Sequence, residues 1–438
     1  MSGKEQTVAR RAAVAGLLGT FIETFDFAVY AYLVVYTAPL FFPSGDPTVA
    51  ILASLMVFAA GFVARPLGGI FFGRMGDRRG RRRTLVVTVA GMGASTCAMG
   101  LLPTHAQVGV VAPILLVVVR LVQGFCAGGE IMGAATYVAE SGSARRHGLF
   151  SSAAPVGAAA GIAFAPAVVG LAAVLLPGTT IGEWGWRIPL LLSLPMTIAT
   201  LLYRLRLEDS PVFQQLAARE ELPNAPFRET LRLHWRAVLR VAALAISINL
   251  AGYTLNTYIP LYLQTVVKLP AGSVYWLAAI TLTLALPATV LSGYAIDRFG
   301  RNRVMVSSLA ACAVLAYPAM VVMGNAASTV VAVGALYWLL LCAVQAASTP
   351  AYVAFVGLFP ARVRYTGAAI GYNVGTIAGG GFAPYAAAQL TTVTGNSQSP
   401  ALLIGGAALI GILTIVTSPS TRSDLTPPAQ DVADAVVE

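Results

Sequence analysis

Charged side chains stand inside long apolar stretches of this sequence, where they could move a proton. Glu23 and Asp26 are three residues apart and so share one face of a helix, while Arg120 lies in another apolar stretch. A charge at the centre of a membrane costs roughly 2.5–3.5 kcal/mol, so such residues persist mainly where they pair or line water. A carboxyl group sheds its proton beside an arginine and binds one in an apolar wall. We expect an Asp26–Arg120 pair that forms and separates with conformation; a permanent structural ion pair is the alternative.

Further buried charges could belong to the same proton-coupling site. Arg120, Gln123 and Glu130 share one face of their helix by spacing, and Arg65 lies in an earlier apolar stretch. Glu23 and Glu130 could each take part in proton binding, hold a substrate or brace a neighbouring helix. With all groups ionised, three acids stand against two arginines. A binding site for di- or tricarboxylates should carry surplus positive charge, so this balance favours a zwitterion or a monocarboxylate.

The second half of the chain offers neutral hydrogen-bonding groups instead of charges. Asn249, Tyr253 and Asn256 follow a spacing of four and then three residues, and Gln345, Thr349 and Tyr352 repeat it. Each set therefore shares one helix face. We predict that one group of polar residues binds the substrate: Tyr30, Gln123, Asn249, Tyr253, Asn256, Gln345, Tyr352 and Asn373. The alternative for each is a hydrogen bond between helices.

A repeated motif divides the chain into two related parts. Residues 73–83 and 293–303 both fit G-x3-D-R-x-G-R-x-R, and the two copies are 220 positions apart. Glycine permits close helix approach and a tight reversal, and the aspartate can meet a helix N-terminus or an arginine. We expect these loops to close one face of the protein; a purely basic loop is the alternative. The predicted gating residues are Gly73, Asp77, Arg78, Gly80, Arg81, Glu140, Arg145, Asp297, Arg298, Gly300 and Arg301.

The elements that carry these residues are membrane helices. Only 11% of the 438 residues are charged and 57% are hydrophobic, so a water-soluble fold of this size lacks its charged shell. A spanning helix needs about 20 mostly apolar residues. We predict an all-α membrane protein with spans at 13–37, 49–72, 85–103, 108–138, 149–176, 187–203, 238–265, 273–296, 304–324, 328–358, 366–391 and 401–418.

The basic residues predict the orientation and the domain boundaries. The net charge of +10 comes from short clusters between apolar stretches, a pattern of loops that face anionic lipid rather than nucleic acid. With the N-terminus in the cytoplasm, 24 of the 28 Lys and Arg residues fall on the cytoplasmic side. We predict six-helix halves at 1–203 and 237–418, a cytoplasmic linker at 204–236 and a disordered cytoplasmic tail at 419–438.

The repeated loop closely resembles the signature loop of the major facilitator superfamily. Other stretches are similar to the metabolite–proton symporter family within it: Gly19–Phe27, Phe62–Gly69, Arg120–Gly124, Gly128–Glu130, Trp186–Pro189 and Arg364–Gly367. Thr24 departs from the tryptophan or other aromatic residue usual there. The resemblance implies a cavity lined by helices 1, 4, 7 and 10. It also places Asp26 and Arg120 at the positions that related sugar–proton symporters use for proton coupling.

The expected function is transport rather than catalysis. The resemblance implies proton-coupled symport, by alternating access, of a small metabolite, and the charge balance favours a proline- or betaine-like zwitterion or a carboxylate. A proton-exchanging exporter and a non-transporting membrane receptor remain alternatives. We expect no metal or other cofactor and no disulfide. The expected partners are the substrate, protons and membrane lipids, and the protein is expected to act as a monomer in a bacterial inner membrane with both termini cytoplasmic.

Overall fold

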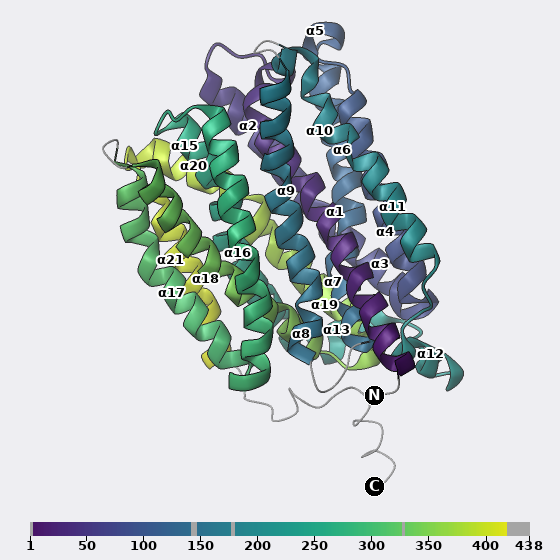
Figure 1. Cartoon of the computed structure of the whole chain (residues 1–438). Coiled ribbons are helices and arrows are strands. Elements are labelled where there is room, and N and C mark those ends of the chain that lie inside the picture. The colour runs from purple at the N-terminus through teal and green to yellow at the C-terminus, as the bar shows by residue number, and fades with distance from the viewer. Residues whose placement is uncertain (1–2, 142–146, 177–179, 326–328, 418–438) are drawn as a thin grey trace.

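The chain folds into a bundle of long helices that run roughly parallel to one another (Figure 1). The computed structural model describes residues 3–141, 147–176, 180–325 and 329–417, together with all side chains in these ranges except those of residues 3–6 and 147. The first half consists of α1 (Gly3–Phe41), α2 (Pro47–Val63), α3 (Arg65–Arg79), α4 (Arg81–Leu101), α5 (His105–Val108), α6 (Val111–Ala127), α7 (Glu130–Ser141), α8 (His147–Ser151), α9 (Ala153–Leu175), a π-helical turn η2 (Ile181–Gly185), α10 (Arg187–Leu191) and α11 (Ser193–Leu205).

Two short helices join this half to the second one. They are α12 (Pro211–Ala218) and α13 (Pro226–Leu233), within the predicted linker. The second half consists of α14 (Trp235–Tyr253), the π-helical η3 (Thr254–Tyr258), α15 (Ile259–Thr265), α16 (Ala271–Phe299), α17 (Arg301–Met323), α18 (Val330–Gly357), a 3₁₀ turn η4 (Ala361–Val363), α19 (Arg364–Thr376), the π-helical η5 (Ile377–Gly381), α20 (Ala383–Thr394) and α21 (Pro400–Val416).

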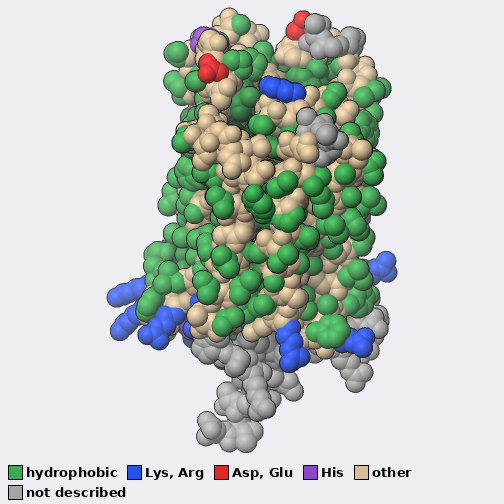
Figure 2. All heavy atoms as spheres, turned by 90° about the vertical axis from the view of Figure 1, so that its left-hand side faces the viewer, with side chains coloured by type: hydrophobic (Ala, Val, Ile, Leu, Met, Phe, Trp, Pro, Cys, Tyr) green, Lys and Arg blue, Asp and Glu red, His purple; other side chains and the backbone are tan. Residues whose placement is uncertain are grey.

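Taken singly or joined end to end, these helices form stretches long enough to cross a membrane. Within the described ranges, ten helical stretches between Thr7 and Gly357 meet the length and hydropathy of a spanning helix. The last two predicted spans correspond to α19–α20, which η5 interrupts, and to the 17-residue α21. Figure 2 shows a broad apolar band across one face, with most of its Lys and Arg side chains at the lower end. We call the end of the bundle where α1 begins the basic end.

Two interruptions in the first half place charged residues at helix starts. The span formed by α2 and α3 breaks at Ala64, just before Pro66, whose ring removes a backbone donor. The span formed by α6 and α7 breaks at Gly128–Gly129, where a Cβ on Gly128 would overlap the carbonyl oxygen of Arg65. Because no side chain separates them, the two broken spans pack with their backbones in contact. This close packing brings Arg65 and Glu130 into the centre of the half.

The two halves meet along pairs of helices that are far apart in the sequence. In Figure 1, α9 of the first half lies beside α16 of the second, and the two helices are in extensive contact. Similarly, α3 packs against α19 at the basic end. These interfaces leave the residues of α1, α7, α9, α14 and α18 facing a common centre, where the candidate site lies.

Candidate functional site

The carboxyl group of Asp26 lies fully buried at the centre of the first half. Its Oδ2 accepts a hydrogen bond from the hydroxyl of Thr96 on α4 at 2.7 Å. Its Oδ1 has no hydrogen-bond partner among the described residues, although the Ser193 side chain of α11 also faces the carboxyl group. One oxygen of this carboxyl is therefore held in place and the other is free to take up a proton.

The predicted direct ion pair between Asp26 and Arg120 is not formed in this structure. Arg120 instead donates to the amide oxygen of Gln123 at 2.5 Å, and the Gln123 amide nitrogen lies 2.7 Å from the Thr96 hydroxyl. A chain of three hydrogen bonds thus joins Arg120 to Asp26 through Gln123 and Thr96. The physical reason is spacing: Gln123 follows Arg120 by one helical turn and lies between the two charges. All four side chains are fully buried.

The Arg120 guanidinium is surrounded by aromatic rings rather than by carboxylates. It lies 4.0 Å from the ring centre of Tyr30, and the rings of Phe27 and Phe58 lie 5.0 and 5.4 Å away. Such contacts stabilise a desolvated cation by about 2 kcal/mol. Among the described residues, its Nε and Nη2 donors find no hydrogen-bond partner. The predicted substrate residue Tyr30 is therefore a neighbour of Arg120, and its hydroxyl donates to the carbonyl of Ser54.

Glu23 pairs with Arg65 of α3. Their side chains approach to 3.1 Å and both are buried. The Arg65 guanidinium also lies over the rings of Phe27 and Phe62, at 4.2 and 4.4 Å. Neither Glu23 oxygen forms a well-directed hydrogen bond within the described part of the chain. The contact is therefore an ion pair with unused hydrogen-bonding capacity, which leaves Glu23 able to bind a further group.

Glu130 has a complete set of partners, which favours bracing among the roles considered for it. Both of its oxygens accept hydrogen bonds from Arg204, and Thr88 donates a further one. Arg204 also donates to the carbonyl oxygens of Leu85 and Ala15 at 2.6 and 3.1 Å. The assignment of Arg204 to the polar linker was wrong, because α11 continues to Leu205 and buries this side chain. The pair ties α7, α4 and α1 to α11.

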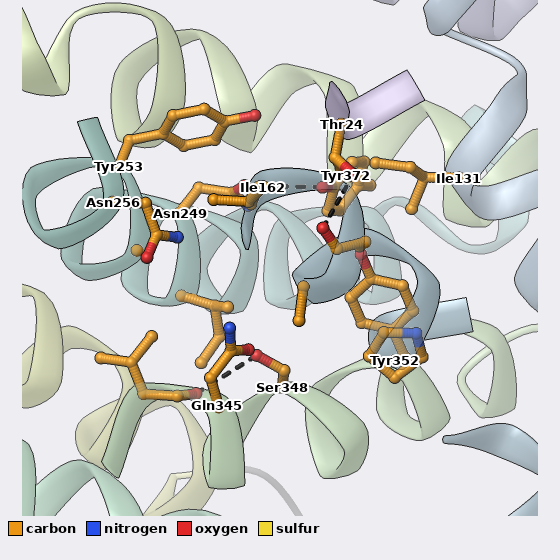
Figure 3. A pocket seen from close by; sticks show the side chains of 16 residues that line it. Thr24, Ile131, Ile162, Asn249, Tyr253, Asn256, Gln345, Ser348, Tyr352 and Tyr372 are labelled. Carbon is orange, nitrogen blue, oxygen red and sulfur yellow. Dashed lines mark hydrogen bonds between the residues drawn. The ribbon is translucent and has the colours of Figure 1, made fainter. Parts of the chain in front are cut away.

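A small cavity lies between the two halves (Figure 3). Its volume is about 60 Å³, which accommodates small molecules or ordered water rather than a large ligand. The first half contributes Thr24 of α1, Ile131 of α7 and an apolar wall from α9. Polar side chains come mainly from the second half: Asn249, Tyr253, Asn256, Gln345, Ser348, Tyr352 and Tyr372. Among the described residues, no Asp, Glu, Lys or Arg lines this cavity.

The structure brings together five of the eight predicted substrate residues. Asn249 and Tyr253 of α14, Asn256 of η3, and Gln345 and Tyr352 of α18 all line the cavity, as Figure 3 shows. The other three lie elsewhere: Tyr30 and Gln123 belong to the Arg120 surroundings, and Asn373 donates to the carbonyls of Gly128 and Ala369.

Tyr372 of α19 is a cavity residue that sequence reasoning missed. Its ring centre lies 6.4 Å from that of Tyr352, and its hydroxyl reaches the Asn249 amide oxygen at 3.5 Å. It directly precedes Asn373, which was the residue predicted from this stretch of sequence, whereas Tyr372 is the one that lines the cavity. Thr349 forms a hydrogen bond between helices, the alternative given above, because its hydroxyl donates to the Thr289 carbonyl of α16.

The first copy of the repeated motif joins the two halves at the basic end. Asp77 accepts hydrogen bonds from the backbone N–H and the hydroxyl of Thr366, at 3.0 and 2.7 Å. Thr366 lies in the first turn of α19, so Asp77 of one half caps a helix of the other. Gly73 allows this contact, because a Cβ there would lie 2.9 Å from the Thr366 Cα. Gly80 has a φ of 103°, which requires glycine.

A buried charge network supports this contact. Arg81 bridges Asp77 and Glu140, at 3.3 and 3.0 Å, and Arg364 of the second half approaches Glu140 at 3.6 Å. The linker joins the network through Asp209, whose Oδ1 accepts from the Arg81 backbone N–H at 2.8 Å. Burial raises the pKa of Asp209, and hydrogen bonds from Ser210, Arg81 and Arg82 oppose this shift.

The second copy of the motif is similar in geometry but more exposed. Asp297 accepts from the Gly148 N–H of α8 at 2.9 Å, which again joins the two halves. Gly300 repeats the positive φ, at 86°. Arg298 is exposed, as is Arg78 in the first copy, and Arg301 is partly buried. Arg145 lies outside the described residues.

Comparisons with known proteins give a consistent result over nearly the whole chain. A family model described as "Sugar (and other) transporter" matches residues 12–425. The proline/betaine transporter of Escherichia coli (strain K12) is 35% identical over 449 aligned residues, covering 97% of this chain and 87% of that protein. The inner membrane metabolite transport protein YhjE of the same strain is 37% identical over 430 residues, covering 95% of each.

A solved structure shows the same fold at low sequence identity. It is the structure of the proton:xylose symporter XylE with a bromo-deoxyglucose bound. Its TM-score is 0.76 with 16% identity, over 99% of this chain and 100% of that one. At this identity the likeness establishes the architecture alone.

Proposed function

This chain belongs to the sugar (and other) transporter family of the major facilitator superfamily and is a membrane transporter rather than an enzyme, and from this premise we propose that it imports a small zwitterion together with protons. The two halves rock about the central cavity, exposing it first to one side of the membrane and then to the other. The substrate class is a compact ammonium carboxylate such as proline or betaine.

The observation that carries proton coupling is the state of the Asp26 carboxyl. It is fully buried, one oxygen is fixed by Thr96, and the other has no partner within the described part of the chain. An ionisable group in such a place is a functional candidate by default. Arg120 supplies the positive charge that favours loss of the proton, and the three-bond chain conveys its influence. Asp26 is therefore the proposed proton carrier.

The lining of the cavity supports a substrate with no net charge. Neutral amides and hydroxyls face a small volume, so a compound carrying a full unpaired charge would be poorly compensated there. The faces of Tyr253, Tyr352 and Tyr372 suit an ammonium group through cation–π contact. A relative named proline/betaine transporter supports the same choice.

The arrangement of basic residues supports a topology for this import. The basic end faces the cytoplasm, in keeping with the positive-inside rule. Because α1 begins at this end, we place both termini on the cytoplasmic side. Gating resides in the contacts of Asp77 with α19 and of Asp297 with α8, which join the halves at this end. A relative named inner membrane metabolite transport protein supports a bacterial inner membrane location. We propose that the protein acts there as a monomer among lipids.

The test is accumulation of labelled proline and glycine betaine in proteoliposomes under an inside-alkaline pH gradient. The parent protein should accumulate one of these compounds, and a proton ionophore should abolish the accumulation. Asp26→Asn should lose accumulation but retain exchange of labelled for unlabelled substrate. Normal accumulation by Asp26→Asn would overturn its role as proton carrier. Loss of preloaded compound on reversing the gradient, with no uptake, would indicate an exporter; binding without any flux would indicate a receptor.

A further inference from the structure

In the chain of hydrogen bonds from Arg120 to Asp26, the donor and the acceptor of the first two bonds are fixed by chemistry. An arginine donates and never accepts, so the Gln123 oxygen must face Arg120 and its amide N–H must face Thr96. The Thr96 oxygen therefore accepts from Gln123, and its single hydrogen is left to choose a partner. Two acceptors are in reach: Asp26 Oδ2 at 2.7 Å and the Met92 carbonyl at 3.1 Å.

We propose that Thr96 is a hydroxyl switch that links the protonation of Asp26 to Gln123 and Arg120, and that it positions the proton site during transport. This inference rests on the proposed proton-coupled function and adds a residue to it. Thr96 is not among the residues that line the cavity; it acts through Asp26. Its hydrogen points to Asp26 or to Met92 according to the charge of the carboxyl group.

The switch follows from the relative strengths of the two hydrogen bonds. While Asp26 is ionised, its bond to Thr96 is charge-assisted and about twice as strong as a neutral one. The hydrogen then points to Oδ2, and the chain holds α1 to α4 and α6. A proton from solution binds at Oδ1, the oxygen without a partner among the described residues. Both acceptors of Thr96 are then neutral, so the Met92 carbonyl competes for the hydrogen and the connection between α1 and α4 loosens.

The chain of hydrogen bonds through Thr96 and Gln123 is the main connection between Asp26 and a positive charge. The apolar helices α2 and α9 carry no ionisable side chain. Ser193 of α11 faces the carboxyl group without being charged. Arg187 of α10 is held by the carbonyls of Gly100 and Leu102. The other ionisable groups around α1 are already paired with each other, namely Glu23 with Arg65 and Glu130 with Arg204.

The experiment compares Thr96→Val, which keeps the shape and loses the hydroxyl, with Thr96→Ser, which keeps the hydroxyl. The initial rate of substrate uptake is measured against external pH in proteoliposomes, with substrate exchange as the measure of folded protein. Hydrogen bonds to charged groups contribute about 1.5–3 kcal/mol, which corresponds to roughly one to two pH units. Without the hydroxyl the carboxylate keeps its proton to higher pH, so Thr96→Val should move the half-maximal pH up by that amount. Thr96→Ser should match the parent.

Several results would overturn the switch while leaving the proposed function intact. An unchanged pH profile in Thr96→Val is one, and equal changes in Thr96→Val and Thr96→Ser are another, since these indicate a packing effect. If Thr96→Val fails to fold, Gln123→Met decides, because it separates Arg120 from the chain and should shift the profile in the same direction by less. Asp26→Asn in the same assay tests the function itself: normal accumulation there refutes the proton carrier independently of Thr96.

Discussion

We predict that the buried ion pair between Glu130 and Arg204 stabilises the fold and does not carry protons. Arg204 forms two hydrogen bonds with Glu130, and the exposed fractions of the two side chains are 1% and 0%. Replacing Glu130 with glutamine removes the negative charge and turns an N–H₂ group towards a buried guanidinium. Two hydrogen bonds to a charged group contribute about 3–6 kcal/mol, and breaking buried ion pairs costs about 3–5 kcal/mol in other proteins. We expect Glu130→Gln to lower the free energy of unfolding by about 3–5 kcal/mol.

The assay is equilibrium unfolding in mixed micelles, in which the denaturing detergent is titrated and intrinsic tryptophan fluorescence is recorded. Glu183→Gln provides the matched control, because Glu183 is exposed in η2 and its replacement should change stability by less than about 0.5 kcal/mol. The double variant Glu130→Leu with Arg204→Met should recover most of the loss, since replacing both partners by apolar groups removes the uncompensated charge.

Transport measurements separate bracing from proton chemistry. The fraction of Glu130→Gln that remains folded should still accumulate substrate under a proton gradient, because Glu130 has no free oxygen to take up a proton. A Glu130→Gln protein that is as stable as the parent but no longer accumulates substrate would refute the reasoning. It would show that the pair opens during the cycle and that Glu130 belongs to the proton pathway.

Three further predictions follow from the contacts described above. Gly19→Ala should destabilise the protein nearly as strongly as Glu130→Gln, as read by the same unfolding assay, because the new Cβ would overlap both members of the ion pair. Asp77→Ala should shift the populations towards a state open at the basic end by about 5- to 30-fold, the equivalent of a 1–2 kcal/mol capping loss, as read from spin-label distances between α3 and α19; Asp297→Ala, at an exposed position, should have a smaller effect. Tyr352→Leu should weaken betaine binding by about 2- to 30-fold while Tyr352→Phe should not, because the ring face rather than the hydroxyl contacts the cation.

The spans and the repeated motif could be predicted from the sequence because their causes are local. An apolar stretch of about 20 residues has few alternatives to crossing a membrane. Gly80 and Gly300 both adopt a positive φ and each follows its aspartate, Asp77 or Asp297, by three residues. The same local turn therefore occurs in both copies of the motif. The cavity-lining face of α14 was predictable for a similar reason, since Asn249, Tyr253 and Asn256 follow the helical repeat.

The partners of the charged residues could not be predicted, since they depend on how helices pack. Arg204 stands among other arginines at the end of an apolar stretch, and only the space beside Gly19 lets it turn inward to Glu130. Likewise, the spacing of Arg120 and Gln123 shows that they share a face but does not reveal that Gln123 stands between Arg120 and Asp26. Asn373 faces α6 and α7 rather than the cavity because its amide meets the Gly128 carbonyl.

The positions of the cavity and of the hydrogen-bond chain from Arg120 to Asp26 indicate which helix would couple proton binding to substrate binding. The chain from Asp26 to Arg120 lies wholly in the first half, on α1, α4 and α6, whereas most polar groups of the cavity belong to the second half. α1 takes part in both, because Thr24 lines the cavity (Figure 3) and Asp26 follows it by two residues. The hydroxyl of Thr24 is tied to the Ala158 carbonyl of α9, so a shift of α1 reaches the cavity wall as well. Under the proposed mechanism, a proton that loosens Asp26 from Thr96 therefore acts on α1, which also lines the cavity proposed for the substrate, and coupling needs no charged residue in the second half.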